Sequence, residues 1–139
     1  MSKISLKIIS LLSILFIGCS NAAPIMTMEF HMGTITNGKS AIGGTLHNTG
    51  DEKIVAAYIN YFISSQPCSY GEVKIFLISS IEPMEKITFT IPVQENMDNY
   101  KIIEFGGLDQ YGYKVKTKDE TAEVIERKNL EKRSKCVPK

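Results

Sequence analysis

The sequence predicts an all-β protein, an immunoglobulin-like antiparallel sandwich of about seven strands followed by a C-terminal helix. Beyond residue 24, short runs of β-branched and aromatic residues alternate with turn residues at the spacing typical of small sandwiches. The chain has 139 residues, of which 43% are hydrophobic and 22% charged, and this size and composition fit one globular domain. After residue 117 the pattern changes, and acidic residues precede basic residues at helical spacing.

The start of the chain has the layout of a secretory signal. Lys3 and Lys7 provide a basic start, and an apolar run follows over residues 8–17. That run is about ten residues long, well short of the roughly 20 residues that a membrane-spanning helix requires. A basic start, a short apolar middle and small residues after it are typical of a cleaved signal peptide. We therefore expect residues 1–18 to direct export.

The end of this leader, LFIGCS, resembles the lipobox of bacterial lipoproteins. Gly18 matches the small residue before the cysteine and Cys19 matches the cysteine itself, whereas Phe16 stands where the family usually has leucine. The resemblance implies that Cys19 is lipidated on its sulfur and becomes the new N-terminus. Because Ser20 rather than aspartate follows, it also implies sorting to the outer membrane. The alternative is ordinary cleavage after Ala22, which would give a soluble secreted binding protein.

The chain has three cysteines, so two of them can pair in a disulfide if the third carries a lipid. If Cys19 is the anchor, Cys68 and Cys136 remain, and an exported protein matures in an oxidising compartment. A disulfide between them would close a loop of about 70 residues and contribute about 4 kcal/mol by the chain-entropy estimate. The alternative is a catalytic thiol at Cys68, but no histidine or basic residue lies near it in the sequence.

The first two expected strands form a hairpin. Residues 25–35 and 40–48 flank Asn37-Gly38, the strongest two-residue hairpin signal. Gly43-Gly44 in the second strand indicates a bulge or a close approach of another backbone. Strict alternation in the first strand predicts one apolar face, made of Met26, Met28, Phe30 and Met32.

Five further strands are expected over residues 54–63, 73–78, 86–93, 99–105 and 111–117. In the first of these, alternation predicts an inward face of Val55, Ala57, Ile59, Tyr61 and Ile63. In the strand over residues 86–93, the predicted inward residues are Ile87, Phe89, Ile91 and Val93, with threonines facing outward.

The C-terminal segment is expected to be a mostly exposed helix over residues 119–133. Thr117 and Glu120 fit a capping box, in which the two side chains satisfy free backbone donors at a helix start. Glu123 and Arg127 lie at the favourable spacing of four residues. The alternative is a last hairpin strand over residues 121–127.

The segment GGTLHNTGDEKIVAAYINYFI is similar to the first half of the FxLYD-type immunoglobulin-like domains of exported bacterial proteins. Gly44, Leu46 and Asn48 match a turn into a long strand, and the run from Ile81 through Pro83 into KITFTIPV matches a later element. YINYF stands in place of the Phe-x-Leu-Tyr-Asp signature. The resemblance implies an immunoglobulin-like fold and a binding or accessory role.

The segment MTMEFHM carries side chains of the kind that bind copper. Thioether and imidazole groups are soft and borderline ligands, so a periplasmic copper-binding carrier that uses His31 and nearby methionines is an alternative function. Strand alternation, however, places the methionines on one face and His31 on the other. Methionine on an apolar strand face is typically core filler, so we expect core packing and no cofactor. The candidate ligands are His31, Met26, Met28 and Met32.

No catalytic motif is present, because the sequence has no GxSxG, phosphate loop, HExxH or paired-cysteine zinc spacing. A net charge of +1 gives no general attraction to nucleic acid. We therefore expect a non-catalytic binding or accessory module of the bacterial envelope. Its expected partners are the membrane, through the lipid anchor, and an envelope protein. The expected segments are a signal peptide (1–18), a lipidated N-terminus with a short linker (19–24), the sandwich (25–117) and the helix with its tail (118–139).

Overall fold

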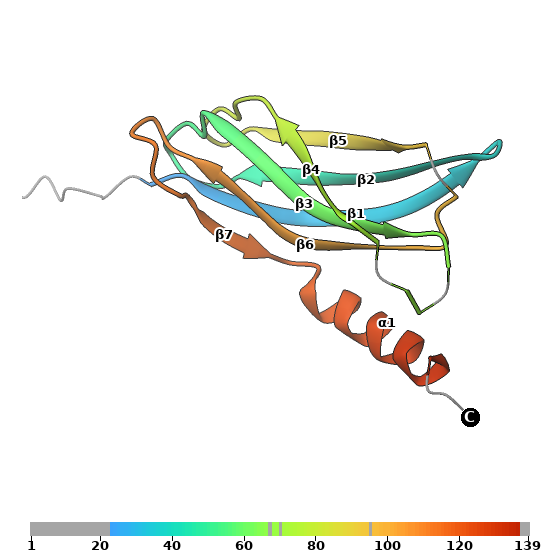
Figure 1. The fold of residues 1–139 in the computed structure, drawn as a ribbon. Helices are drawn as coiled ribbons and strands as arrows, with labels where there is room; N and C mark the ends of the chain where they lie inside the picture. The colour runs from blue at the N-terminus through green and yellow to red at the C-terminus, as the bar shows by residue number, and fades with distance from the viewer. Residues whose placement is uncertain (1–22, 67, 70, 95, 137–139) are drawn as a thin grey trace, which may run out of the picture.

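The computed structural model describes residues 23–66, 68–69, 71–94 and 96–136 (Figure 1). The predicted signal peptide and Cys19 lie outside the described residues, as does the predicted cleavage site after Ala22.

The described residues form a two-layer β-sandwich with one C-terminal helix, which confirms the predicted fold class. One sheet has the strand order β5-β2-β1-β7 and the other has the order β4-β3-β6. The elements are β1 (Ile25–Thr36), β2 (Lys39–Asn48), β3 (Ala56–Ser64), β4 (Val73–Ile78), β5 (Lys86–Val93), β6 (Asn99–Leu108), β7 (Lys116–Asp119) and α1 (Ala122–Lys135).

The sandwich is not antiparallel throughout, because β7 pairs in parallel with β1. The expected strand over residues 111–117 is also wrong in position. The carboxylate of Asp109 accepts hydrogen bonds from the backbone N–H groups of Tyr111 and Tyr113, at 2.8 and 2.9 Å, and Gly112 has a φ of 82°. These contacts make a tight loop after β6. The chain leaves this loop toward the other sheet, where a short β7 runs beside β1.

The helix forms as predicted, and the alternative strand over residues 121–127 is wrong. The predicted capping box is also wrong, because Thr117 lies within β7. The turn before α1 is held instead by Asp119, whose Oδ1 accepts from the Thr121 N–H at 2.8 Å and from the Thr121 hydroxyl at 2.7 Å. α1 therefore begins at Ala122, four residues after the residue that would follow a cap at Thr117.

The β1–β2 hairpin turns at Asn37-Gly38 as predicted, and both residues have positive φ, at 51° and 73°. Positive φ at both central residues is the conformation of a type I′ turn. Closer to the start of β1, the register with β2 shifts between Met28 and Phe30, so Glu29 is the extra residue of a β-bulge.

After this bulge, the side chains of β1 that alternation would place in the core face outward, and the others face the core. Met26 and Met28 are buried, as predicted, but Phe30 and Met32 are 50% and 46% exposed. The expectation of one continuous apolar face over all four residues is therefore wrong. An extra residue in a strand with a period of two moves every later side chain to the opposite face. His31 is half-buried on the core side as a result.

Gly44 pairs with His31 just after the bulge, and its lack of a side chain is required there. A Cβ atom at Gly44 would lie 2.5 Å from the carbonyl oxygen of Phe30 and 2.5 Å from the ring of Phe89. The close approach predicted from Gly43-Gly44 is thus present, and the bulge itself lies in the neighbouring strand.

The core fills the space between the inner faces of the two sheets. The alternation predicted for β5 is confirmed, since Phe89, Ile91 and Val93 are buried and the threonines between them are exposed. On β3 the predicted inward residues are buried except for Val55, which lies outside the strand and is 41% exposed. The buried inward residues of β3 are Ala57, Ile59, Tyr61 and Ile63.

One buried polar side chain ties the loops together at one end of the sandwich. Asn48 is fully buried, and its Nδ2 donates to the carbonyl oxygens of Glu52 at 2.7 Å and Glu82 at 3.1 Å. Its Oδ1 accepts from the Gly50 N–H at 3.1 Å. With a further bond from Nδ2 to the carbonyl oxygen of Ile81 at 3.3 Å, this buried amide satisfies four backbone groups and fixes the positions of the loops before β3 and β5.

Candidate interaction surface

The outer side of β4 carries a row of exposed aliphatic side chains, Val73, Ile75 and Leu77, which we call the β4 row. Their exposed fractions are 64%, 64% and 76%. The alternate residues Phe76 and Ile78 turn inward and pack against the core. Large apolar side chains exposed together are uncommon on soluble domains and mark interaction sites.

The residue pattern of β4 is an ambiguous signal for this surface. VKIFLI is apolar at both odd and even positions, which is typical of a strand buried on both faces. β4 is instead the edge strand of its sheet, and the part of the chain that the structure describes places no strand or helix over its outer face. The β4 row is exposed because no described element covers this face of the sheet, and the edge position removes a neighbouring strand on one side.

Polar groups border the β4 row on the neighbouring strands. Tyr58 of β3 lies opposite Leu77, and its hydroxyl donates to Oε1 of Glu104 on β6 at 3.1 Å. Partial burial, together with this carboxylate, raises the pKa of Tyr58 above its ordinary value. An apolar centre beside tyrosine and charged groups is the composition of a protein–protein interface.

The other sheet ends in an edge strand with a different surface. The outward residues of β5 are Lys86, Thr88, Thr90 and Pro92. Lys86 lies 2.7 Å from the carboxylate of Glu29, which His47 also contacts at 2.8 Å. The hydrogen bond from Lys86, assisted by His47, holds the pKa of Glu29 below its ordinary value. The β5 edge is polar, and Pro92 has no backbone N–H to offer a further strand.

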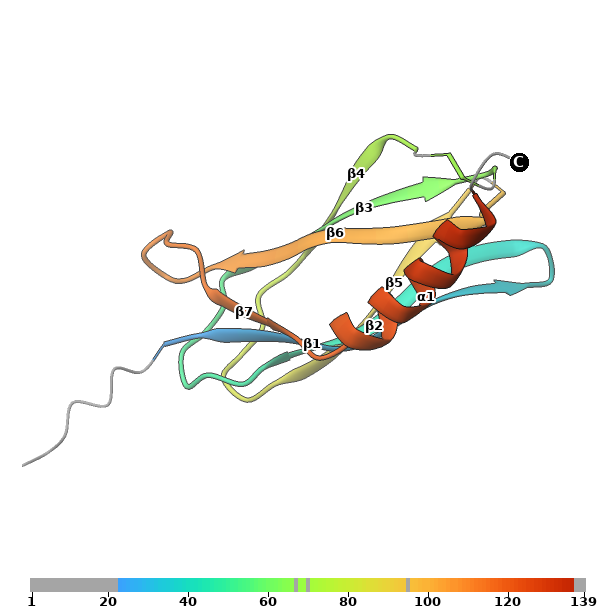
Figure 2. The ribbon, with the colours of Figure 1, turned by 90° about the horizontal axis from the view of Figure 1, so that it is seen from below.

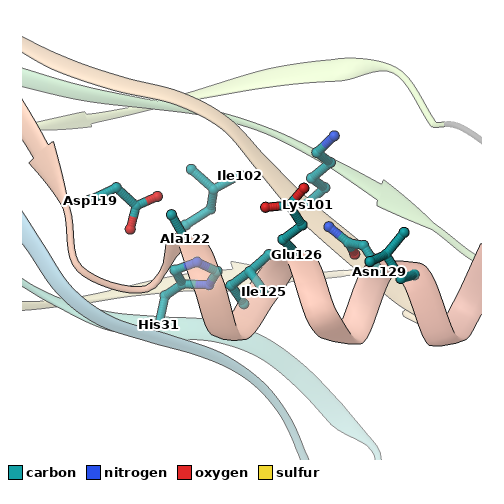
Figure 3. A pocket seen from close by; sticks show the side chains of 9 residues that line it. His31, Lys101, Ile102, Asp119, Ala122, Ile125, Glu126 and Asn129 are labelled. Atoms are coloured by element: carbon teal, nitrogen blue, oxygen red, sulfur yellow. The ribbon is translucent and has the colours of Figure 1, made fainter.

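The remaining side of the sandwich, between β6 and β1, is covered by α1 (Figure 2). A groove of about 290 Å³ lies under this helix (Figure 3). Ile102 of β6 and Ile125 of α1 provide its apolar part, and the other lining side chains include Lys101, Asp119 and Glu126. The groove carries charges of both signs, so it presents no uniform electrostatic preference to a ligand.

His31 lies at the floor of this groove and not in a ligand cluster. Its Nδ1 is hydrogen-bonded to the hydroxyl of Tyr100 at 2.9 Å, and the two rings meet edge-on with centroids 5.7 Å apart. Burial lowers the pKa of His31, while Asp119 opposes and Lys128 adds to this shift.

The four candidate copper ligands are not brought together on one side of β1. His31 and Met32 are adjacent in the strand and face opposite sides, whereas Met26 and Met28 are fully buried in the core. Within the described ranges, no three side chains of histidine, cysteine, aspartate or glutamate cluster as a metal site. The geometry of Met26 and Met28 is that of core packing, whereas the core packing expected for Met32 is wrong, because that side chain is turned outward.

The structure joins Cys68 and Cys136 in a disulfide, the pair expected from the cysteine count, with Cα atoms 5.6 Å apart. The bond links the C-terminal end of α1 to the loop between β3 and β4. Both cysteines lie at exposed positions. With its sulfur in this bond, Cys68 has no free thiol for the nucleophilic role considered above.

Comparisons with known proteins show little likeness. No protein-family model matches the sequence, and no curated protein matches it either. One solved structure, described as the structural characterization of IrmA from Escherichia coli, is similar over 70% of this chain and 92% of that chain. The identity is 12% and the TM-score is 0.48, so the likeness assigns neither a family nor a function. No helix among the described residues has the length and apolar content needed to cross a membrane.

Proposed function

We propose that this protein is an exported, non-catalytic binding module of the bacterial envelope, held at the membrane by a lipid on Cys19. Its binding surface is the β4 row. The observation that carries the proposal is the exposure of three aliphatic side chains together on one edge strand, at 64% to 76%. The lipobox resemblance supports the anchor, and the absence of catalytic motifs in the sequence supports the non-catalytic role.

The β4 row has the physical features of a surface that is covered in use. Burying an aliphatic side chain of this size against a partner stabilises the complex by about 1.5 to 3 kcal/mol before the costs of association are counted. A lipid tether raises the local concentration of the domain at the membrane, so a small apolar surface is sufficient for binding there.

The anchor is tested by the intact mass of the protein expressed with its own leader in a bacterial host, with and without reduction. A diacyl- or triacyl-modified chain beginning at Cys19 is the expected species, and it gains two hydrogens when the Cys68–Cys136 bond is reduced. An unmodified chain beginning at Ala23 would instead establish the soluble secreted form.

The binding surface is tested by photo-crosslinking in the same cells. A photoreactive residue is placed at Leu77 of the β4 row or at Ile35 of β1, which are 76% and 66% exposed. We expect protein adducts from position 77 and few from position 35. The adducts should disappear when Ile75→Lys is added, because a lysine charge disfavours burial of the row. Equal adducts from both positions, insensitive to Ile75→Lys, would contradict the proposal.

A further inference from the structure

We infer that the β4 row binds a second copy of this chain, with the two β4 strands paired antiparallel about a two-fold axis at Ile75. This inference rests on the proposed function, because it names the partner of the same surface. The pairing would join two three-stranded sheets into one continuous sheet of six strands.

The edge of β4 is suited to pairing with another strand. β4 has a neighbour on one side only, namely β3. In an edge strand, backbone N–H and C=O groups point away from the sheet without a ladder partner. Natural edges are protected by lysine, proline, bulges or a covering element. Of these protections β4 carries one, the lysine Lys74 on its inward-alternating side, whereas its outward side chains are all aliphatic.

The sequence of β4 is self-complementary in one antiparallel register. A two-fold axis perpendicular to the sheet places residues of the same face opposite one another, which excludes shifts by a single residue. With the axis at Ile75, Val73 lies opposite the copy's Leu77 and Ile75 lies opposite its own counterpart. Lys74 then lies opposite Phe76, so no like charges meet. The two β4 rows become one cluster of six adjoining aliphatic side chains.

The neighbouring registers fit less well. An axis at Lys74 brings two lysines directly opposite each other, which is destabilising. An axis at Phe76 places Val73 opposite Ser79, so the outer-face pairs between two aliphatic residues fall from three to two. The register at Ile75 therefore gives the most apolar contact without a charge conflict.

The assembly closes at two copies, because the other described edges are protected. β5 ends its sheet with Lys86, two threonines and Pro92 facing outward. β7 is four residues long and exposed along its whole length, with lysines at 116 and 118. Along its first part the open side of β6 faces α1, and at its end Leu108 bridges to Lys114 (Figure 2). A single self-complementary edge gives an isologous pair, which does not propagate into a filament.

The test is disulfide crosslinking of single-cysteine additions to the full chain, expressed with its own leader and oxidised in the membrane. In an antiparallel pair, directly opposed Cα atoms lie about 4.5 to 5.5 Å apart, which suits a disulfide. Ile75→Cys should therefore give a covalent dimer in a yield at least about tenfold above the control Ile35→Cys, since only pairs within ~7 Å can be bridged. The two positions are 64% and 66% exposed, so the variants are matched in accessibility.

The register is tested by two further variants. Neither Val73→Cys alone nor Leu77→Cys alone should give more dimer than the control, because neither position lies opposite its own counterpart in this register. Chains carrying Val73→Cys and chains carrying Leu77→Cys, produced together, should crosslink to each other. Peptide mapping identifies the bridged residues and verifies that Cys68–Cys136 is intact.

The outcomes separate this inference from the proposed function. If Ile75→Cys crosslinks no better than Ile35→Cys while the photoreactive residue at position 77 captures a different protein, a second copy is not the occupant and the binding role stands. If neither position captures any protein, both proposals are overturned. If Val73→Cys dimerises as well as Ile75→Cys, the strand register is wrong.

Discussion

The two edge strands β4 and β5 both place apolar side chains in the core, but their solvent-facing side chains differ, being aliphatic on β4 and mostly polar on β5. Each turns apolar residues inward, Phe76 and Ile78 from β4 and Phe89 and Ile91 from β5. Outward, β4 presents the aliphatic β4 row and β5 presents Lys86, threonines and Pro92. The inward side chains determine that a strand packs in the sandwich. The outward side chains influence whether its edge can pair with a further strand.

This separation of roles has an energetic reason. Inward residues lose contact with water on folding and contribute to folding stability in proportion to the area buried. Exposed residues change that stability by a few tenths of a kcal/mol when substituted. An apolar outer row is thus not explained by folding, and the association proposed above would account for it.

The largest difference between the two edges is expected when the disulfide is removed. Replacing both Cys68 and Cys136 by serine should lower the free energy of unfolding by about 4 kcal/mol, because the bond closes a loop of nearly 70 residues. Since Cys68 precedes β4, amide hydrogen exchange should accelerate at the start of β4 and in α1 before it does in β5. Urea unfolding and hydrogen exchange measure the two effects. Uniform acceleration over both edges would show that the bond does not act locally.

The next largest effect compares an isoleucine of each strand. Ile91→Ala in β5 should lower the free energy of unfolding by about 3 kcal/mol, because the side chain is 2% exposed and its loss leaves a cavity. Ile75→Ala in β4 should change it by less than about 0.5 kcal/mol, because that side chain is largely in solvent. Denaturant titration of both variants provides the measurement. A loss at Ile75 comparable with that at Ile91 would make the β4 row part of the folding core.

A smaller effect is expected when the outer faces are exchanged. The variant Ile75→Thr/Leu77→Thr gives β4 the outer face of β5 and should weaken self-association by about tenfold or more. The reverse variant, Thr90→Ile/Pro92→Thr, should create a new association at β5. Sedimentation of the detergent-solubilised chain measures both. Unfolding midpoints serve as the control, and an unchanged association in the first variant would exclude the β4 row as the contact.

The smallest effect is the pH dependence of the free energy of unfolding, and it should be the same for both edges. Burial lowers the pKa of His31 from its ordinary 6.5 in the folded chain. The unfolded chain therefore binds this proton first as the pH falls. The contribution of neutral His31 to the free energy of unfolding is therefore complete above pH 6.5, and it is lost as the pH falls through the lower pKa of the folded state. His31→Gln should flatten that part of the stability curve, as measured by denaturant titration at several pH values. An unchanged curve would place the titrating group elsewhere.

Much of the fold follows from local patterns in the chain. The hairpin at Asn37-Gly38 is predictable because both residues tolerate positive φ, and the inner face of β5 is predictable because its alternation is unbroken. The pairing of Cys68 with Cys136 follows from parity once Cys19 is assigned to the anchor. The C-terminal helix follows from charge spacing, although its start is set by Asp119 and not by Thr117.

The sequence by itself determined the approximate positions of the first six strands, the presence of a C-terminal helix and the inner face of β5. Only the tertiary structure decided that an extra residue at Glu29 turns Phe30 and Met32 outward and His31 inward. It also decided that β7 runs parallel to β1, and that β4 ends its sheet with the β4 row in solvent. The physical reason is that periodicity depends on the backbone of one strand alone. Burial and exposure depend on which neighbours the other strands place beside it.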